Sequence, residues 1–376
     1  PMNAVPLTSP GRAARTEALF AAGASLAVAQ ELLAYSEGRE PFAAALPTLP
    51  LADEPHLAAW AGYVEQATPG AAATVLREVL IQLHFPIRRG ISRQPDYLRA
   101  TRQGQLPAAL PPGLPLAEPD KVQISLHEGP AGRLPVIVAG CRADFVTLLQ
   151  ALWYRNEPVA VPDNIGAAFI SGYNNWARIR ELKHSWLAEN QPIAALAASE
   201  WAAAFKQTIA PHPGLYQDRF MLVGPGAYSG ITAATLGLTP AEWAALSLRL
   251  RIEHEYTHYA LQRLGWPLRA HALDELLADF RALVEVTGQP TLPWLNHLLG
   301  LETAEPGRLA HYRGESPLSE PAFALLRRLV AAAAERMAAE WRELPAGARR
   351  GPALLPFLAS FAAQPLELLA TSPEPV

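Results

Sequence analysis

The sequence predicts a mostly α-helical protein of the α+β class, in which one small β-sheet precedes a long helix in the C-terminal half. Three observations support this fold class. Long segments rich in Ala, Leu and Glu carry apolar residues at helical spacing. Short apolar segments bounded by Gly and Pro, which are typical of strands, occur between residues 122 and 230. Half of the 376 residues are hydrophobic and 18% are charged, which indicates a folded chain that can bury a large core.

Helices are expected through most of the first hundred residues. Helical spacing extends over residues 14–35, 51–67 and 70–84. The stretch ALFAAGASLAVAQE (18–31) follows two arginines and ends in a small-x-small pattern, which also occurs in signal peptides. Because it lacks a long leucine block, we predict that it is an ordinary helix.

A proline-rich segment at 106–121 separates this helical part from the rest of the chain. We therefore predict a helical N-terminal region over residues 1–112 and a second domain over residues 120–376. Within the second domain, the residue pattern predicts strands at 122–126, 134–139 and 219–230 and helices at 144–155, 174–189 and 192–209. From Thr239 onward the pattern predicts helices alone.

Composition and charge argue against some classes of partner. The formal net charge of −4 gives no electrostatic reason to expect nucleic acid. No apolar run reaches the roughly 18–20 residues that a membrane helix needs, so no membrane partner is expected. Cys141 is the only cysteine, which rules out an intrachain disulfide and suits a reducing compartment. We expect a cytoplasmic protein.

The stretch RIEHEYTHYALQRLGW (251–266) places two histidines four residues apart, with a glutamate directly after the first. The helix that carries it has clear end signals. Thr239 is a good N-cap residue, Pro240 suits the first helical position, and Glu242 completes a capping box. Gly265 suits the position after the last turn. These signals predict a helix of about 25 residues with both histidines near its middle.

This motif is typical of a metal site. His254 and His258 are close to one helical turn apart, so both imidazoles project from one face and can bind one metal ion. Glu255 lies about 100° further round the helix, where a carboxylate can reach a metal-bound water without being a ligand. Two neutral nitrogen donors would hold Zn²⁺, and the glutamate would take a proton from the water. The alternative is an amphipathic helix whose histidines are solvated or hydrogen-bonded in the core.

A third ligand would separate these alternatives. The segment HALDELLADFRALVEVTG (271–288) is predicted to be a helix with Glu275 and Asp279 on one face. A short turn between the helices would bring Glu275 to the histidines, and Asp279 could accept a hydrogen bond from the outer nitrogen of a ligand histidine. His271, at the start of the helix, is a second candidate for the third ligand. The alternative is that Asp274, Glu275 and Asp279 form a solvated acidic face.

The pattern His254-Glu255-x-x-His258 followed by Glu275-x-x-x-Asp279 resembles that of the gluzincins, the zinc metallopeptidases typified by thermolysin and the M1 aminopeptidases. The resemblance covers about 40 residues of the chain. It implies a zincin-like catalytic domain in which both histidines and Glu275 bind Zn²⁺. It also implies that Glu255 is the general base and that Asp279 orients a ligand histidine.

The chain departs from the gluzincin pattern at two points. Sixteen residues separate His258 from Glu275, slightly fewer than is usual in that family, and Asp274 replaces the usual asparagine before the glutamate. The metzincin pattern does not apply, because Leu261 and Leu264 stand where its glycine and third histidine would be.

Residues outside the motif are candidates for contacts with a substrate. The strand at 219–230 is the best candidate for an edge strand on which an extended peptide docks, as the resemblance implies, and the alternative is a plain buried strand that ends in a tight turn. The transition state of amide hydrolysis needs a donor to its oxyanion, and the candidates for this catalytic role are Tyr228, His311 and Tyr312. Arg313 could bind a substrate carboxylate. The alternative for each residue is a surface or packing role.

A basic segment, FPIRRGISRQPDYLRATR (85–102), holds five arginines against one aspartate. It is either a site for an anionic group of a substrate or partner, or a solvated basic face.

Together these features predict a zinc-dependent hydrolase that acts on a small peptide or amide substrate, with Glu255 as general base. There are two alternatives. The first is a non-haem Fe(II) oxygenase, because two histidines and one carboxylate also form the metal site of those enzymes. The second is a metal-binding protein without catalytic activity.

Overall fold

The computed structural model describes residues 11–36, 47–109, 113–266, 272–302, 307–313 and 318–371. They form two compact units, which we call the helical unit and the sheet unit. The helical unit takes its described residues from 1–51, 129–131 and 227–376, and the sheet unit takes its described residues from 52–128 and 132–226.

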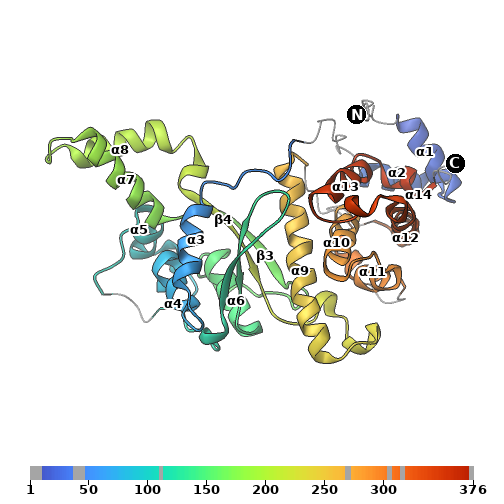
Figure 1. The fold of residues 1–376 in the computed structure, drawn as a ribbon, viewed down its shortest axis with the longest axis horizontal. Helices are drawn as coiled ribbons and strands as arrows, with labels where there is room; N and C mark the ends of the chain where they lie inside the picture. Colours follow the sequence, from blue (N-terminus) through green and yellow to red (C-terminus); the bar gives the residue numbers. More distant parts are fainter. Residues whose placement is uncertain are drawn as a thin grey trace. The chain divides into compact units, whose positions relative to one another are not determined.

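The chain is mostly helical and contains one four-stranded mixed sheet, as the sequence predicts for the α+β class (Figure 1). The predicted boundary between residues 112 and 120 falls inside the sheet unit. Leu114, within the proline-rich segment, is buried in the core of the sheet unit, and Pro119–Lys121 form a short 3₁₀ helix. The described residues of the segment therefore belong to the unit around them.

The strands of the sheet are β1 (Gln123–His127), β2 (Leu134–Val138), β3 (Ala167–Asn174) and β4 (Gln217–Val223), in the order β1-β2-β4-β3. β1 and β2 form an antiparallel pair at the predicted positions. β4 runs parallel to β2 and antiparallel to β3. The prediction of an edge strand at 219–230 is therefore wrong. An apolar run suits a central strand, which is buried on both faces, and here a partner strand lies on each side of β4.

The helices of the sheet unit are α3 (Leu57–Gln66), α4 (Ala72–Val79), α5 (Pro95–Gln103), α6 (Arg142–Leu152), α7 (Trp176–Asn190) and α8 (Ala197–Ala204). Side chains of α3, α4 and α6 share one core with one face of the sheet. Phe220 and Leu222 are fully buried in this core, and Met221 and Val223 are fully buried on the other face of the sheet, which explains why β4 is a continuous apolar run.

β3 is a strand that the sequence analysis did not predict. Gly172, with φ of 72°, lies where the register between β3 and β4 shifts, so a bulge interrupts the alternation of apolar and polar residues. The side chain of Asn175 directly after β3 accepts hydrogen bonds from two backbone N–H groups at the start of α7.

The helices of the helical unit are α1 (Arg12–Ala21), α2 (Leu26–Tyr35), α9 (Pro240–Arg263), α10 (Ala272–Thr287), α11 (Leu292–Leu299), α12 (Glu320–Glu343), α13 (Leu355–Ala362) and α14 (Leu366–Thr371). The single helix predicted at 14–35 is two helices. Gly23, with φ of 90°, ends the first, and the Ser25 hydroxyl caps the second. Within the described residues, no helix is long and apolar enough to cross a membrane.

α10 is the central helix of the helical unit. It contacts α9, α11, α12 and α13, and every residue from 272 to 284 is buried. Asp274, Glu275 and Asp279 are thus at most 3% exposed, and the interpretation of a solvated acidic face is wrong. Because buried charges are costly without partners, the surroundings of these carboxylates must supply donors or cations.

Candidate metal centre

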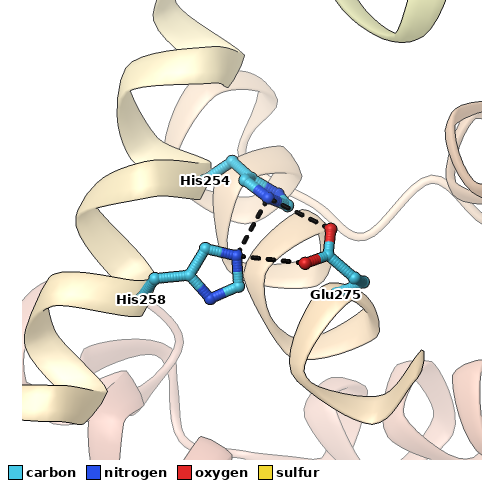
Figure 2. Close-up of side chains that lie close together, drawn as sticks. All are labelled: His254, His258 and Glu275. Atoms are coloured by element: carbon cyan, nitrogen blue, oxygen red, sulfur yellow. Dashed lines mark hydrogen bonds and ion pairs between the residues drawn. The ribbon is translucent and has the colours of Figure 1, made fainter. Parts of the chain in front are cut away.

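α9 carries the two histidines and has both predicted ends. The Thr239 hydroxyl accepts a hydrogen bond from the Glu242 N–H at 3.3 Å, and the Glu242 carboxylate accepts one from the Thr239 N–H at 2.9 Å. Gly265 follows the last turn with φ of 84°. His254 and His258 lie near the middle of this helix and point from one face toward α10 (Figure 2).

His254, His258 and Glu275 lie together, with one ligand atom of each within 4.8 Å of the others. The Nε2 atoms of the two histidines are 3.1 Å apart. The carboxylate of Glu275 faces both rings: Oε2 lies 3.4 Å from His254 Nε2, and Oε1 lies 3.3 Å from His258 Nε2 (Figure 2). The structure therefore brings the three predicted ligands together. His271, the second candidate for the third ligand, is outside the described residues.

Asp279 lies behind His254 and is fully buried. Its Oδ1 atom is 2.8 Å from His254 Nδ1 and accepts a hydrogen bond from the Tyr228 hydroxyl at 2.6 Å. When Nδ1 donates to a carboxylate, the lone pair of Nε2 is left for a metal. Asp279 is thus placed where a residue that orients a ligand histidine must lie.

Arg308 is a residue of this site that the sequence analysis missed. It begins the short 3₁₀ helix η8 (Arg308–Tyr312). Its Nη2 atom forms an ion pair with Asp279 and lies 3.5 Å from Glu275 Oε2, and its Nη1 atom donates to the Tyr228 hydroxyl at 2.8 Å. Two buried carboxylates require a nearby cation, but that requirement alone does not say which arginine supplies it.

The charges of the site are strongly coupled. Burial disfavours a charged His254, but Asp279 and Glu275 outweigh burial and raise the pKa of His254 to about 10. Burial alone would raise the pKa of Glu275, yet His254 and His258 hold it well below its usual range. Burial also opposes the ionisation of Asp279, but the charges of Arg308 and His254 lower its pKa below the usual value. Both carboxylates are ionised. Arg308 balances one of their two negative charges, and a proton on His254 balances the other.

The cluster fits a divalent metal ion. Glu275 Oε2 is buried and accepts no hydrogen bond from the described residues, and Arg308 Nη2 lies 3.5 Å away, so this oxygen still has the capacity to bind a metal ion. Two imidazole nitrogens and one carboxylate oxygen form a donor set of Zn²⁺ and of non-haem Fe²⁺. A divalent ion would take the place of the proton on His254 and balance the excess negative charge.

Glu255 follows His254 on α9 and is half-buried. Within the part of the chain that the structure describes, no side chain pairs with its carboxylate. Burial, and then the charges of Glu275 and Glu255, raise the pKa of Tyr312 above its usual range. Glu255 is therefore close to the ligand cluster and available to bind water.

The three candidate oxyanion donors lie in different surroundings. The Tyr312 hydroxyl forms a hydrogen bond with Glu275, so it reaches the cluster. Tyr228 is buried and donates its only hydroxyl proton to Asp279, which is a supporting position. His311 is exposed, and its Nδ1 atom lies 3.0 Å from a backbone oxygen of its own turn. Tyr312 is thus the only one of the three that reaches the proposed ligands, and it would have to turn its hydroxyl proton from Glu275 to act as an oxyanion donor.

The remaining candidate arginines have other contacts. Arg313 donates to both carboxylate oxygens of Glu320, at 2.7 and 3.2 Å, and lies over the ring of Phe323, so two of its donors already have an acceptor. The arginines of segment 85–102 belong to the sheet unit and are all exposed. One of them, Arg88, lines a cavity of about 240 Å³.

Comparison of the chain with curated proteins and with solved structures found no match. A family model does match it, over residues 17–373, a range that includes every residue of the candidate metal centre. The chain belongs to that family, which is described as a family of unknown function (DUF7005).

Proposed function

We propose that this chain is a zinc-dependent hydrolase of peptide or amide bonds, with a zincin-like catalytic unit. The proposal rests on one observation: His254, His258 and Glu275 meet beside Glu255, a carboxylate with no side-chain partner among the described residues. Three protein ligands with two nitrogens and one oxygen leave a position open, as in catalytic rather than structural zinc sites. The resemblance of the motif to the gluzincins supports the same roles.

Zinc held by these residues would acidify a water molecule and polarise the substrate carbonyl. The residues around it have separate tasks. Glu255 accepts the proton of the attacking water and then donates it to the leaving amine. Tyr312 keeps its proton at neutral pH, because its pKa is raised, and it can donate a hydrogen bond to the oxyanion. Asp279 and Arg308 hold the ring of His254.

The test compares Glu255→Gln with Glu253→Gln, both purified without added metal. Glu253 lies on the same helix, and its carboxylate pairs with Arg281 at 2.8 Å, so the control removes an equivalent charge from a structural ion pair. Metal content is measured by elemental analysis, and hydrolysis is measured as free amine released from a mixture of short synthetic peptides. We expect about one zinc per chain in all proteins and a loss of about 10²- to 10⁴-fold in hydrolysis in Glu255→Gln alone.

Other outcomes would replace the proposal with a defined alternative. Iron in place of zinc, with oxygen-dependent chemistry, would indicate the non-haem oxygenase. Zinc without hydrolysis in the unmodified protein would indicate a metal-binding protein without this activity. Loss of metal from Glu255→Gln would make Glu255 a ligand and remove the general base from the mechanism.

A further inference from the structure

Tyr35, the last residue of α2, connects the N-terminal part of the chain with the metal centre. Its hydroxyl accepts a hydrogen bond from the Ala272 N–H at 2.9 Å and donates one to the Tyr312 carbonyl oxygen at 2.8 Å. One oxygen atom therefore joins the first residue of α10 to the last residue of η8.

The contact with Ala272 acts on the helix that carries the third ligand. The N–H groups in the first turn of a helix have no acceptor inside the helix, and a partner from elsewhere must satisfy them. Tyr35 supplies that partner at the first residue of α10. Glu275 follows three residues later, close to one turn along the same helix. The position of the hydroxyl therefore helps to set where the carboxylate of Glu275 lies.

The contact with Tyr312 reaches Glu275 by a second route. Tyr35 holds the backbone carbonyl of Tyr312, while the side chain of Tyr312 forms a hydrogen bond with Glu275. The two routes start at one hydroxyl and meet at one carboxylate. A shift of α2 would thus displace the carboxylate of Glu275 through both contacts.

α2 is itself held firmly in the helical unit. Leu32 and Leu33 are at most 5% exposed and belong to the main core cluster of this unit. The carboxylate of Glu31 accepts hydrogen bonds from the backbone N–H and the hydroxyl of Ser319, at 2.8 and 2.9 Å, at the start of α12. The Tyr35 hydroxyl therefore extends from a fixed helix.

We propose that Tyr35 is a positioning residue for the metal ligand Glu275, and that α2 is in this way part of the metal centre. The inference rests on the proposed metal site and does not depend on the reaction. Tyr35 acts on Glu275 through Ala272 and Tyr312.

The test is Tyr35→Phe, which removes one hydroxyl and keeps the ring. The probe is Zn²⁺, and its dissociation constant is measured by competition with a chromophoric chelator. Loss of a residue that holds a metal ligand directly lowers metal affinity by about 10- to 100-fold, so we expect a smaller loss of about 3- to 10-fold here. The visible spectrum of the Co²⁺-substituted protein should also change, since it reports ligand geometry.

Tyr97→Phe is the matched control. Tyr97 is 1% exposed in the sheet unit, and its hydroxyl donates to Asn156 at 3.1 Å, so the variant also loses one buried hydrogen bond. Its Zn²⁺ affinity and Co²⁺ spectrum should equal those of the unmodified protein. A role of Tyr35 in overall stability alone would affect the two variants alike.

A second readout needs no metal. In the metal-free protein, Tyr35→Phe should speed amide hydrogen exchange over residues 272–280, while Tyr97→Phe should not. Unchanged Zn²⁺ affinity together with unchanged exchange there would overturn the proposal. If the unmodified protein bound no Zn²⁺, the proposed function would fail, and the exchange measurement alone would decide whether Tyr35 holds α10.

Discussion

At the residue scale, Asp279 has two roles that are easily confused in an experiment. It accepts a hydrogen bond from His254, which fixes the ring for metal binding, and it is the counter-ion of the buried Arg308. Replacing Asp279 by alanine removes both at once. Arg308 would then keep only Glu275, at 3.5 Å, as a counter-ion, and the lost ion pair would destabilise the fold even if the metal ligands were unaffected.

Two variants separate these roles. Asp279→Ala should lower the free energy of unfolding by about 3 kcal/mol, because it removes the closest counter-ion of the partly buried Arg308. The double variant Asp279→Ala/Arg308→Met should recover part of that loss, since it also removes the arginine that has lost its closest counter-ion, while His254 and His258 still face Glu275. Both should bind Zn²⁺ about 10- to 100-fold more weakly, because His254 lacks its acceptor in each. Urea unfolding and chelator competition check the two expectations. A double variant with unchanged Zn²⁺ affinity would show that Asp279 serves only as a counter-ion.

The residues of the site differ in how far the sequence could predict them. His254, Glu255 and His258 follow from spacing within one helix, and Glu275 follows from the same periodicity in the next helix. Arg308 could not be predicted in this way. It approaches the site from a short 3₁₀ helix after α11, and no periodicity connects it to the ligands.

At the scale of elements, a buried polar network joins three parts of the sheet unit. Asp218 on β4 accepts hydrogen bonds from Trp60 on α3 at 2.8 Å and from Asn175 before α7 at 2.6 Å, and it forms an ion pair with Arg178 on α7. His56, directly before α3, is 2% exposed, and its Nε2 atom has no hydrogen-bond partner among the described residues. His56 is close enough to this network for the charges of Asp218 and Arg178 to act on it.

This arrangement predicts a loss of stability in mild acid. Burial lowers the pKa of His56 below its ordinary value of 6.5, although Asp218 and Glu54 partly oppose this. In the unfolded chain the histidine takes up a proton near pH 6.5, while in the folded chain it stays neutral to lower pH. Its stabilising effect is therefore complete above pH 6.5 and is lost as the pH falls from 6.5 toward the folded pKa, by at most about 1.4 kcal/mol per pH unit.

The measurement compares urea unfolding between pH 7.5 and 5 for the unmodified protein, His56→Gln and His184→Gln. His184 is exposed on α7, so its replacement should leave the slope with pH unchanged. His56→Gln should have the shallower slope, because the other titrating groups are common to all three proteins. Equal slopes in all three would mean that His56 accepts a proton in the folded state as readily as in the unfolded state.

Elements with local signals were predicted best. The capping box of α9, the β1–β2 pair and most helices follow from residues close together in the chain. β3 was missed because a bulge at Gly172 disturbs its alternation, and β4 was given the wrong place in the sheet. Strand order depends on which segments meet in space, and an apolar run does not contain that information.

At the scale of the whole molecule, each unit is built from segments that are far apart in the sequence. α1 and α2 belong with the C-terminal helices, and residues 129–131, between β1 and β2, also belong to the helical unit. Local patterns in the sequence predict neither association, because each joins segments far apart in the chain. The consequence for function is that every residue of the candidate metal centre lies in one unit, although its supports come from both ends of the sequence.

This distribution predicts that Zn²⁺ acts unequally on the two units. A ligand that binds only the folded state stabilises it by RT ln(1 + [L]/Kd), which is about 2.7 kcal/mol at a concentration of 100 Kd. Amide hydrogen exchange that requires unfolding of the helical unit should therefore slow by up to about 100-fold in α9 and α10. Exchange in β2 and β4 should change much less.

His258→Ala is the control for this effect, since it lacks one ligand, and added Zn²⁺ should leave its exchange unchanged. Equal slowing in both units of the unmodified protein would show that they unfold as one, and slowing in β2 and β4 alone would place the ion outside the candidate centre. The expected result, slowing confined to the helical unit and lost in His258→Ala, would tie the ion to the site where α9 and α10 meet. Because exchange needs no substrate, this measurement tests the metal centre before any reaction has been identified.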